Sequence, residues 1–310
     1  MVGVTTVVKI GGARAVDPDG ALADVASLVE SGEDVVVVHG GSTAVDETLE
    51  ALGEEPEYVE TPGGVVGRFT DERTMAVFEM VLPGKLNTDL TAGLLNEGVN
   101  AVGLSGVDGR LLAGPRKSAV RVQEDGRKKI RRGDHSGTIE QVNADLLETL
   151  LAGGYTPVAT VPMAGKDGVR EARSASASAS GDDEEPRAQW LPVNADADRA
   201  AAAIAGALEG DLVVLTDVAG VYADPDDAGT RIESVETVDD WSDLEAAAEG
   251  FMTKKVMAAR EALEGGAASV AVASANANAP VTSALDGDAT TVLPSALESE
   301  LDEDAEVSAR

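Results

Sequence analysis

Four consecutive valines followed by a histidine and two glycines restrict the fold of this chain more than any other feature. The valines at residues 35–38 are apolar at every position, so the strand that they predict must be covered on both faces. Strands buried on both faces are typical of parallel sheets, because the connections between parallel strands place helices over either side. A second apolar run, at residues 5–10, also ends in a glycine pair, Gly11 and Gly12. The sequence therefore predicts two parallel strands, each joined to a following helix through a Gly-Gly corner.

Apolar runs and helical patterns alternate along the rest of the chain. Further strands are predicted at residues 100–104, 119–123, 129–132, 156–161, 212–216 and 269–273. Helices are predicted at residues 21–31, 44–52, 72–84 running on to 97, 139–152, 198–208, 241–249 and 253–264. This alternation predicts βαβ units, and hence an α/β fold with a mainly parallel sheet and helices on both faces. Asp125 and Gly126 are the exception, since an Asp-Gly pair between two short runs predicts a β-hairpin.

Two segments lack the pattern of any regular element. Residues 166–189 are rich in serine, alanine and charge, and we predict a flexible insertion there. Residues 298–310 form an acidic tail that we predict to be disordered. The remainder of residues 1–295 is predicted to be one domain, since the chain is long enough for a single large α/β core.

The net charge of −32, from 24 basic and 56 acidic residues, argues against nucleic acid as a partner, because nonspecific binding needs a basic surface. Such an acidic excess with few lysines is typical of proteins from a high-salt cytoplasm, so we predict a halophilic, cytoplasmic protein. No apolar run approaches the ~20 residues of a membrane span, and no secretion signal is recognisable. With no cysteine and two distant histidines, a thiolate or histidine metal centre is not expected.

One of the eight lysines of the chain, Lys9, ends the first predicted strand beside its glycine pair, and Gly40 and Gly41 end the second strand. Open α/β sheets bind ligands at the carboxyl ends of their strands, and lysine with bare glycine N–H groups suits an anion. Each Gly-Gly corner alone fits a plain tight turn, but two together favour an anion site. We interpret His39 as a packing residue at the strand end rather than as a base.

Polar side chains also lie near two predicted helix starts. Arg68 follows a glycine-rich loop and is placed to clamp a substrate carboxylate, although pairing with Asp71 or Glu72 is about equally open. Asn194 and Asp198 open an alanine-rich helix, where Asn194 could bind substrate and Asp198 could hold lysines in place. The alternative is a cluster of helix caps, and we expect one of its residues to serve as the cap.

A second phosphate pocket is predicted from Thr216 and Asp217, at the end of a buried strand, together with the segment that holds Lys254 and Lys255. No Walker A or G-x-G-x-x-G pattern is present, so neither a P-loop NTPase nor a dinucleotide fold is indicated. No nucleophile with a neighbouring base is recognisable either. A carboxylate substrate that attacks the γ-phosphate of ATP needs no such base, because it is already ionised; the protein then only positions two anions and neutralises charge.

Six motifs resemble, in order, those of the amino acid kinase family, and acetylglutamate kinases especially. They are Val8-Lys9-Ile10-Gly11-Gly12, His39-Gly40-Gly41, Gly67-Arg68-Phe69-Thr70-Asp71, Asn194 to Asp198, Leu215 to Val221 and Gly250 to Val256. The resemblance covers residues 5–295 apart from the insertion. It implies a three-layer α/β/α sandwich and a homodimer. It also implies an acyl-acceptor half at about residues 1–190 and an ATP half at about residues 191–295.

The resemblance further implies roles for single residues. Lys9 and Lys255 would stabilise the transferring phosphoryl group, and Asp198 would organise the two lysines. The acceptor would be bound by Gly40, Gly41, Arg68 and Asn194. The nucleotide would be bound by Gly11, Gly12, Thr216, Asp217, Tyr222 and Lys254. ATP would bring Mg²⁺ on its phosphates, with no metal site in the protein itself; whether Lys254 or Lys255 is the catalytic lysine stays open.

One branch of the family is more similar than the rest. Residues 104–111, 116–120 and 132–143 resemble kinases that phosphorylate glutamate or 2-aminoadipate attached to a small acidic amino-group carrier protein, in arginine or lysine biosynthesis. Independently, residues 110–132 hold nine of the 24 basic residues and only two acidic ones, which predicts a docking surface for an acidic partner. The docking residues that we single out are Arg110, Arg116, Lys117, Arg127, Lys128 and Lys129.

Two other functions stay open. A kinase for free N-acetylglutamate would have no use for the basic segment. A non-catalytic, amino-acid-sensing member of the fold would be expected to lack Lys9 or Lys255, and both are present. Glutamate and 2-aminoadipate differ by one methylene, which is a matter of pocket depth rather than of motif.

Overall fold

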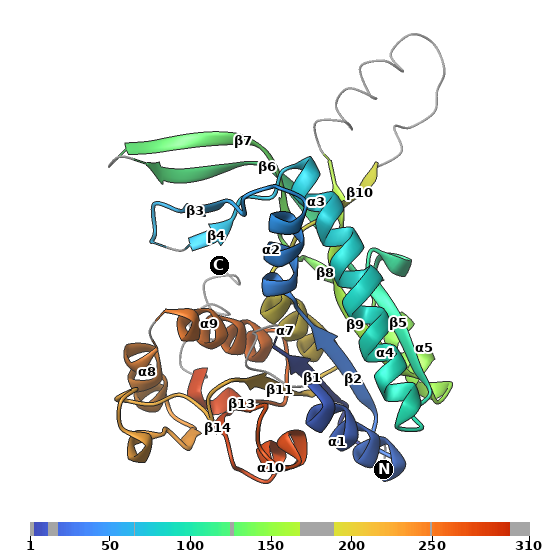
Figure 1. Cartoon of the computed structure of the whole chain (residues 1–310). Helices are drawn as coiled ribbons and strands as arrows, with labels where there is room; N and C mark the ends of the chain where they lie inside the picture. The colour runs from blue at the N-terminus through green and yellow to red at the C-terminus, as the bar shows by residue number, and fades with distance from the viewer. Residues whose placement is uncertain are drawn as a thin grey trace, which may run out of the picture.

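The computed structural model describes residues 3–11, 18–64, 66–124, 127–167, 189–248 and 250–297. Within them, twelve strands form one sheet with helices packed on both of its faces (Figure 1). This three-layer α/β/α sandwich with a mainly parallel sheet confirms the predicted fold class. Gly12, the predicted tail and all but the ends of the predicted insertion lie outside the described residues.

Parallel strands with almost wholly apolar sequences form the centre of the sheet. In spatial order they are β13 (Ser269–Ser274), β11 (Asp211–Thr216), β1 (Thr6–Ile10), β2 (Val35–His39), β9 (Thr156–Lys166) and β5 (Ala101–Gly106). Val7 and Val36 belong to one hydrophobic core, and Val8 and Val37 belong to the other. The valine run is therefore buried on both faces, as predicted.

Shorter or more polar strands extend this centre. β14 (Thr290–Val292) runs antiparallel to β13 and pairs with β12 (Ser234–Val235), while β10 (Trp190–Val193) runs antiparallel to the end of β9. β6 (Leu112–Glu124) pairs with β9 and with β8 (Gln141–Val142), and forms a long hairpin with β7 (Arg127–Gly137). A separate pair, β3 (Tyr58–Glu60) and β4 (Val66–Arg68), packs on this hairpin through Val59, Phe69 and Val122. The hairpin was predicted, and the short strands were not.

Helices contribute to both cores. The first core takes side chains from α2 (Ser42–Ala51), α3 (Glu72–Glu79), α5 (Ala144–Ala152), α7 (Ala197–Ala207), α8 (Val238–Ala247) and α9 (Phe251–Glu264). The second takes them from α1 (Pro18–Glu30), α4 (Asn87–Asn96) and α10 (Pro280–Leu285). A π-helical segment, Met80–Leu86, separates α3 from α4 and contains Pro83, which has no N–H to donate. The helix predicted at 139–152 begins only at Ala144, because Asn143 caps it.

A buried carboxylate joins two helices that lie far apart in the sequence. Asp24 of α1, 5% exposed, accepts hydrogen bonds from the backbone N–H groups of Val281 (2.6 Å) and Thr282 (2.8 Å) and from the Thr282 hydroxyl (2.7 Å). These N–H groups open α10 and have no partner within the helix. Asp24 therefore caps α10 from a different helix.

Replacing Asp24 by alanine should lower the free energy of unfolding by about 2 kcal/mol, since a lost cap costs ~1 kcal/mol and buried unpaired donors add a similar amount. Urea denaturation would measure this loss, with Glu30→Ala at the exposed end of α1 as the control. The kcat of the folded variant should be unchanged. An unfolding free energy equal to that of the Glu30 variant would contradict the capping role.

Candidate active site

Three charged side chains from three elements meet at the carboxyl end of β1. Lys9 Nζ lies 2.5 Å from Oδ1 of Asp198, in the first turn of α7, and Lys255 Nζ on α9 lies 3.7 Å from Oδ2 of the same carboxylate. The three side chains are only 6%, 14% and 15% exposed, in the order Lys9, Asp198, Lys255. One carboxylate therefore holds two ammonium groups together, and Lys255, not Lys254, is its second partner.

The electrostatics of this group favour an anionic ligand. Burial alone would raise the pKa of Asp198, but the charges of Lys9 and Lys255 hold that pKa below its usual value. Burial lowers the pKa of Lys255; Asp198 opposes that shift and Lys9 adds to it. Two ammonium groups and one carboxylate leave one excess positive charge in a poorly solvated place, and such a charge attracts phosphate.

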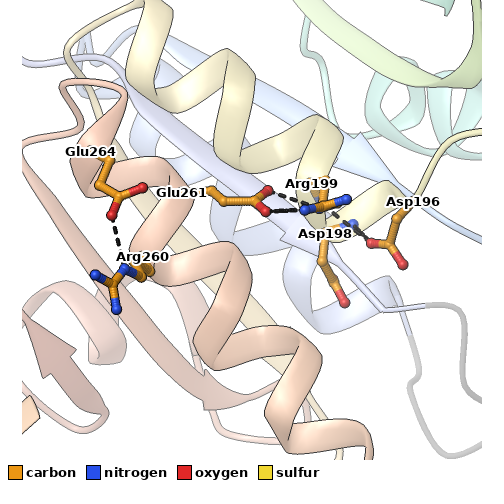
Figure 2. A network of polar contacts seen from close by, with 6 residues as sticks. All are labelled: Asp196, Asp198, Arg199, Arg260, Glu261 and Glu264. Atoms are coloured by element: carbon orange, nitrogen blue, oxygen red, sulfur yellow. Dashed lines mark hydrogen bonds and ion pairs between the residues drawn. The ribbon is translucent and has the colours of Figure 1, made fainter. Parts of the chain in front are cut away.

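The start of α7 is built to present Asp198. The Asp196 side chain caps the helix by accepting the backbone N–H groups of Asp198 (2.9 Å) and Arg199 (3.3 Å), so Asp196 is the capping residue of the predicted cluster. Arg199 binds both carboxylate oxygens of Glu261 and thereby fastens α7 to α9, while the Asp198 carboxylate points away from that pair (Figure 2). Two helices fixed to each other thus carry Asp198 and Lys255.

The Gly40–Gly41 corner lies against the same end of α7. A side chain on Gly40 would press on the Ala197 side chain at 3.2 Å, and one on Gly41 would collide with Leu82 and Leu86. A side chain at either position would therefore have to displace a neighbour, and the corner packs directly beside the residue that precedes Asp198. The structure brings the second predicted Gly-Gly corner to the lysine pair.

His39, just before this corner, is 2% exposed, and its Nδ1–H donates to the Gly40 carbonyl over 2.9 Å. Burial, together with the positive charge of Lys9, lowers the pKa of His39 to about 4 even though the bond to Gly40 acts in the other direction. The imidazole is therefore neutral at neutral pH. This agrees with its interpretation as a packing residue.

Arg68 on β4 faces the N-terminus of α2. Its guanidinium forms an ion pair with Asp46 of α2, and donates to the Tyr58 hydroxyl (2.8 Å) and to the Ser42 carbonyl (3.3 Å). Pairing with Asp71 or Glu72, the alternative that the sequence left open, does not occur; Asp71 instead caps α3 by accepting the Thr74 N–H. Arg68 thus lies close to Ser42, the residue that follows Gly41, where we predicted the acceptor.

Asn194 precedes α7 and reaches the segment that carries Arg68. Its side-chain amide donates to the Thr70 hydroxyl over 3.0 Å, and its backbone pairs with β7 through His135 and Gly137. Thr70 is fully buried, so Asn194 is held in place from both sides. Arg68 and Asn194 therefore belong to one connected group, whose contact with substrate stays a prediction.

The predicted nucleotide residues separate into two sets. Leu215 is the register partner of Ile10, which places Thr216 beside Gly11 at the carboxyl edge, and Asp217 is near enough to raise the pKa of Lys255 slightly against the effect of burial. Lys254 lies apart from this edge, because its Nζ donates to the Val66 carbonyl of β4 over 2.9 Å. No contact among the described residues links Tyr222 to the lysine pair; it forms a β-bridge with Arg231.

Only some of the basic side chains in residues 110–132 lie on the surface. Arg116 is a correction to the predicted docking residues: its side chain is 13% exposed, pairs with Asp167 at 3.1 Å and donates to the Asp134 carbonyl. Lys117, Arg127, Lys128 and Lys129 are exposed, and the Arg110 guanidinium lies over the Trp190 ring.

Asp46 and Tyr58 were missed from the sequence, and Asp196 was not singled out within the predicted cluster of caps. Asp46 and Tyr58 lie 22 and 10 residues from Arg68, and no motif connects them. The Asp196 cap had a signal, the Asp-x-Asp before an alanine-rich helix. Burial and the hydrogen bond to Asp46 raise the pKa of Tyr58, which keeps its hydroxyl protonated as the donor to that carboxylate.

No helix in the described part of the chain is long and apolar enough to span a membrane. The sequence matches the model of the amino acid kinase family over residues 4–274. It is 42% identical over 287 residues to [LysW]-aminoadipate kinase from Deinococcus radiodurans, covering 92% of this chain and 90% of that protein. It is 40% identical over 263 residues to acetylglutamate kinase from Methanopyrus kandleri, covering 84% of this chain and 91% of that protein.

The fold is also similar to that of a solved enzyme. N-acetylglutamate synthase from Neisseria gonorrhoeae, in complex with coenzyme A and N-acetyl-glutamate, matches with a TM-score of 0.70 at 22% identity. The match covers 94% of this chain and 60% of that one, so this chain corresponds to part of the larger protein.

Proposed function

This chain belongs to the amino acid kinase family, and we propose that it transfers the γ-phosphoryl group of ATP to the side-chain carboxylate of glutamate or 2-aminoadipate held on an acidic amino-group carrier protein. The observation that carries the proposal is the pair of lysines on Asp198, next to the Gly40–Gly41 corner. The identity to [LysW]-aminoadipate kinase supports the carrier-borne acceptor. The product would be an acyl phosphate for arginine or lysine biosynthesis.

The chemical step needs positioning and charge more than it needs a base. A carboxylate oxygen of the acceptor forms a bond to the γ-phosphorus, the bond from that phosphorus to the β–γ bridging oxygen breaks, and ADP leaves with the electron pair. No proton is transferred. Lys9 and Lys255 neutralise the oxygens of the phosphoryl group in transit, and Asp198 keeps both ammonium groups converged before the substrates arrive.

Mg²⁺ would enter on the phosphates of ATP and would offset part of their negative charge. Among the described residues there is no group of three or more His, Asp or Glu that could hold a metal ion. As the resemblance implies, we assign Thr216 and Gly11, at the edge of β11 and β1, to the nucleotide. As the resemblance implies, we also propose a homodimer, and a cytoplasmic location where ATP is available.

The proposal is tested by assaying the purified protein with ATP, Mg²⁺ and the carrier protein loaded with glutamate or with 2-aminoadipate. Hydroxylamine would trap the acyl phosphate as a hydroxamate on the carrier, which mass spectrometry detects. ADP release without hydroxamate, or no turnover with either loaded carrier, would contradict the proposed function. The same assay with each of the two loads shows which amino acid is preferred.

A second candidate is phosphorylation of free N-acetylglutamate. The 40% identity to an acetylglutamate kinase favours it, and the same lysine pair would serve it. Free N-acetylglutamate in the hydroxylamine assay separates the two functions. Turnover of the free compound that exceeds turnover of the loaded carriers would make this second candidate the function.

Replacing Arg68 by alanine should raise the KM for the acceptor roughly tenfold to a hundredfold and leave the KM for ATP nearly unchanged. A charge-assisted hydrogen bond to a carboxylate is worth about 1.5–3 kcal/mol, and it is lost equally from the bound ground state and the transition state. Steady-state kinetics measure both constants, with Arg73→Ala, an exposed arginine on α3, as the control. An unchanged acceptor KM would show that Arg68 serves only to bind Asp46.

A further inference from the structure

The two faces of the β6–β7 hairpin differ in what their basic side chains contact. Residues that are directly opposite in an antiparallel pair share a face, and neighbours along a strand alternate. Arg121 is opposite Ile130, and Gln123 is opposite Lys128, while Val122 is opposite Lys129. Arg121, Lys128 and Ile130 therefore share one face, and Lys129 lies on the other.

The second of these faces is used inside the molecule, and we call it the inner face. Val122 on it is buried against Val59 and Phe69 beneath the hairpin. Arg131 stacks on the Phe69 ring at 4.2 Å and forms an ion pair with Glu57. Arg131 on the inner face thus helps to hold β3 and β4, and with them Arg68.

On the opposite face, which we call the outer face, lie Arg121, Lys128, Ile130 and Arg132. Lys117 continues this face toward the base of the hairpin, two residues before Ala119 on β6 and across a shift in the register with β7. All five are exposed, and among the described residues none of the four cations has an acidic partner. Acidic residues outnumber basic ones 56 to 24, so an unpaired set of four cations stands out from the rest of the surface. The outer face therefore has a field opposite in sign to that of the whole protein.

Apolar side chains lie on the same surface. Ile130, at its centre, is 65% exposed. At the base of the hairpin, Pro115 pairs with Lys166 and Lys166 with Trp190, which continues the outer face onto β10. Trp190 is 36% exposed, with Lys166 at 5.2 Å and Arg110 at 5.6 Å from its ring. Tryptophan and arginine are the residues that most often anchor protein interfaces.

We propose that the outer face, from Trp190 to Ile130, is the surface on which the acidic carrier protein docks, with Ile130 and Trp190 as its apolar anchors. This inference rests on the proposed function and adds to it the face, the anchors and the exclusion of the inner face. From Pro115 to Gln123 the strand spans about 26 Å at ~3.3 Å per residue, which suits a partner surface of standard size. A second copy of this chain, with its net charge of −32, is acidic as well, so it is the alternative occupant that the experiment must exclude.

The hairpin provides its own matched control. Arg121→Glu with Lys128→Glu reverses two outer charges, and Arg127→Glu with Lys129→Glu makes the same change in net charge on the inner side. Binding of the glutamate-loaded carrier, measured by biolayer interferometry at low salt, should weaken on the order of tenfold or more for the outer pair and far less for the inner pair. Equal weakening by both pairs would overturn the assignment of a face and leave only unspecific attraction.

Measurements at two salt concentrations distinguish the contribution of the apolar anchors to carrier binding from that of the charges. At 1 M salt the Debye length is ~3 Å, so attraction over a distance is screened, whereas apolar contact persists. Ile130→Ser should therefore weaken carrier binding at both low and high salt, and an unchanged affinity at both would contradict the role of Ile130. Static light scattering of each variant tests the other occupant: a shift from dimer to monomer with the outer pair would make this face a contact between copies and overturn the docking proposal.

Failure of this inference can be told from failure of the proposed function. If the wild-type protein neither binds the loaded carrier nor phosphorylates it, the function is wrong. If the wild type does both and the outer variants match it, only the docking surface is wrong.

Discussion

Replacing Lys9 by alanine should lower kcat on the order of 10²–10³-fold while leaving the fold intact. The Lys9 side chain is 6% exposed and its ammonium group lies 2.5 Å from Asp198, so its position is fixed before the substrates bind. A preorganised charge in a poorly solvated site stabilises developing charge far more than the same charge in water. Lys255→Ala should have an effect of the same order, because Lys255 is held by the other oxygen of the same carboxylate.

Lys254→Ala is the matched control for both variants. It removes one lysine from the same turn of α9, but a lysine that binds the Val66 carbonyl instead of Asp198. Single-turnover kinetics with saturating ATP and loaded carrier would measure the chemical step, and circular dichroism would verify the fold. A Lys9→Ala enzyme with near-normal kcat, or a Lys254→Ala enzyme as impaired as Lys255→Ala, would show that the phosphoryl site lies elsewhere.

Replacing Asp198 by asparagine should destabilise the protein by about 3–5 kcal/mol in the absence of nucleotide. The change leaves two buried ammonium groups without their shared counterion, and breaking a buried pair from one side costs about this much. ATP should restore part of the loss, because its phosphates supply the missing negative charge and bind only the folded state. Urea denaturation with and without ATP measures both effects.

The loss of stability caused by Asp198→Asn should depend on pH, because the pKa of Asp198 is lowered in the folded wild-type protein. A carboxyl whose pKa is lower in the folded state stabilises the fold at pH values above its unfolded pKa, and this contribution is lost as the pH falls through the folded value. The difference in stability between wild type and Asp198→Asn should therefore be full at pH 7 and shrink below about pH 4. Asp196→Asn is the control, since asparagine caps a helix as well as aspartate does. A difference that persists undiminished into acid would mean that the charge of Asp198 is not what stabilises the fold.

The elements that the sequence predicted are those in which a local pattern decides the structure. The valine run on β2 has no alternative to burial on both faces, and Gly40 and Gly41 lie where β2 gives way to α2. Once these strands are parallel, Lys9 and Gly40 are bound to meet at one edge of the sheet. The short strands β3, β12 and β14 have two or three residues each, too few to show any period.

The site residues that the sequence left open depend on register and on contacts distant in the chain. Arg68 finds Asp46 because β4 lies against α2, and Arg116 is buried because strand alternation turns it toward Asp167. The basic segment 110–132 likewise has a composition that the sequence shows, whereas its division into two faces follows from which residue of β6 lies opposite which residue of β7. The spacing of residues within one motif shows neither the register of the strands nor the contacts between residues that are distant in the chain.

Lys254 and Lys255 are successive residues of α9, so their side chains leave the helix about 100° apart. The phase of this helix is fixed downstream, where Val256, Ala259 and Leu263 pack into the core. Deleting Lys255 would therefore move Lys254 into the direction that faces Asp198 and put Thr253 opposite the Val66 carbonyl. A one-residue deletion should thus preserve a lysine at the phosphoryl site and lose only the bond to β4, whereas the substitution Lys255→Ala removes the charge itself. Deleting Lys255 should therefore lower kcat less than replacing Lys255 by alanine does.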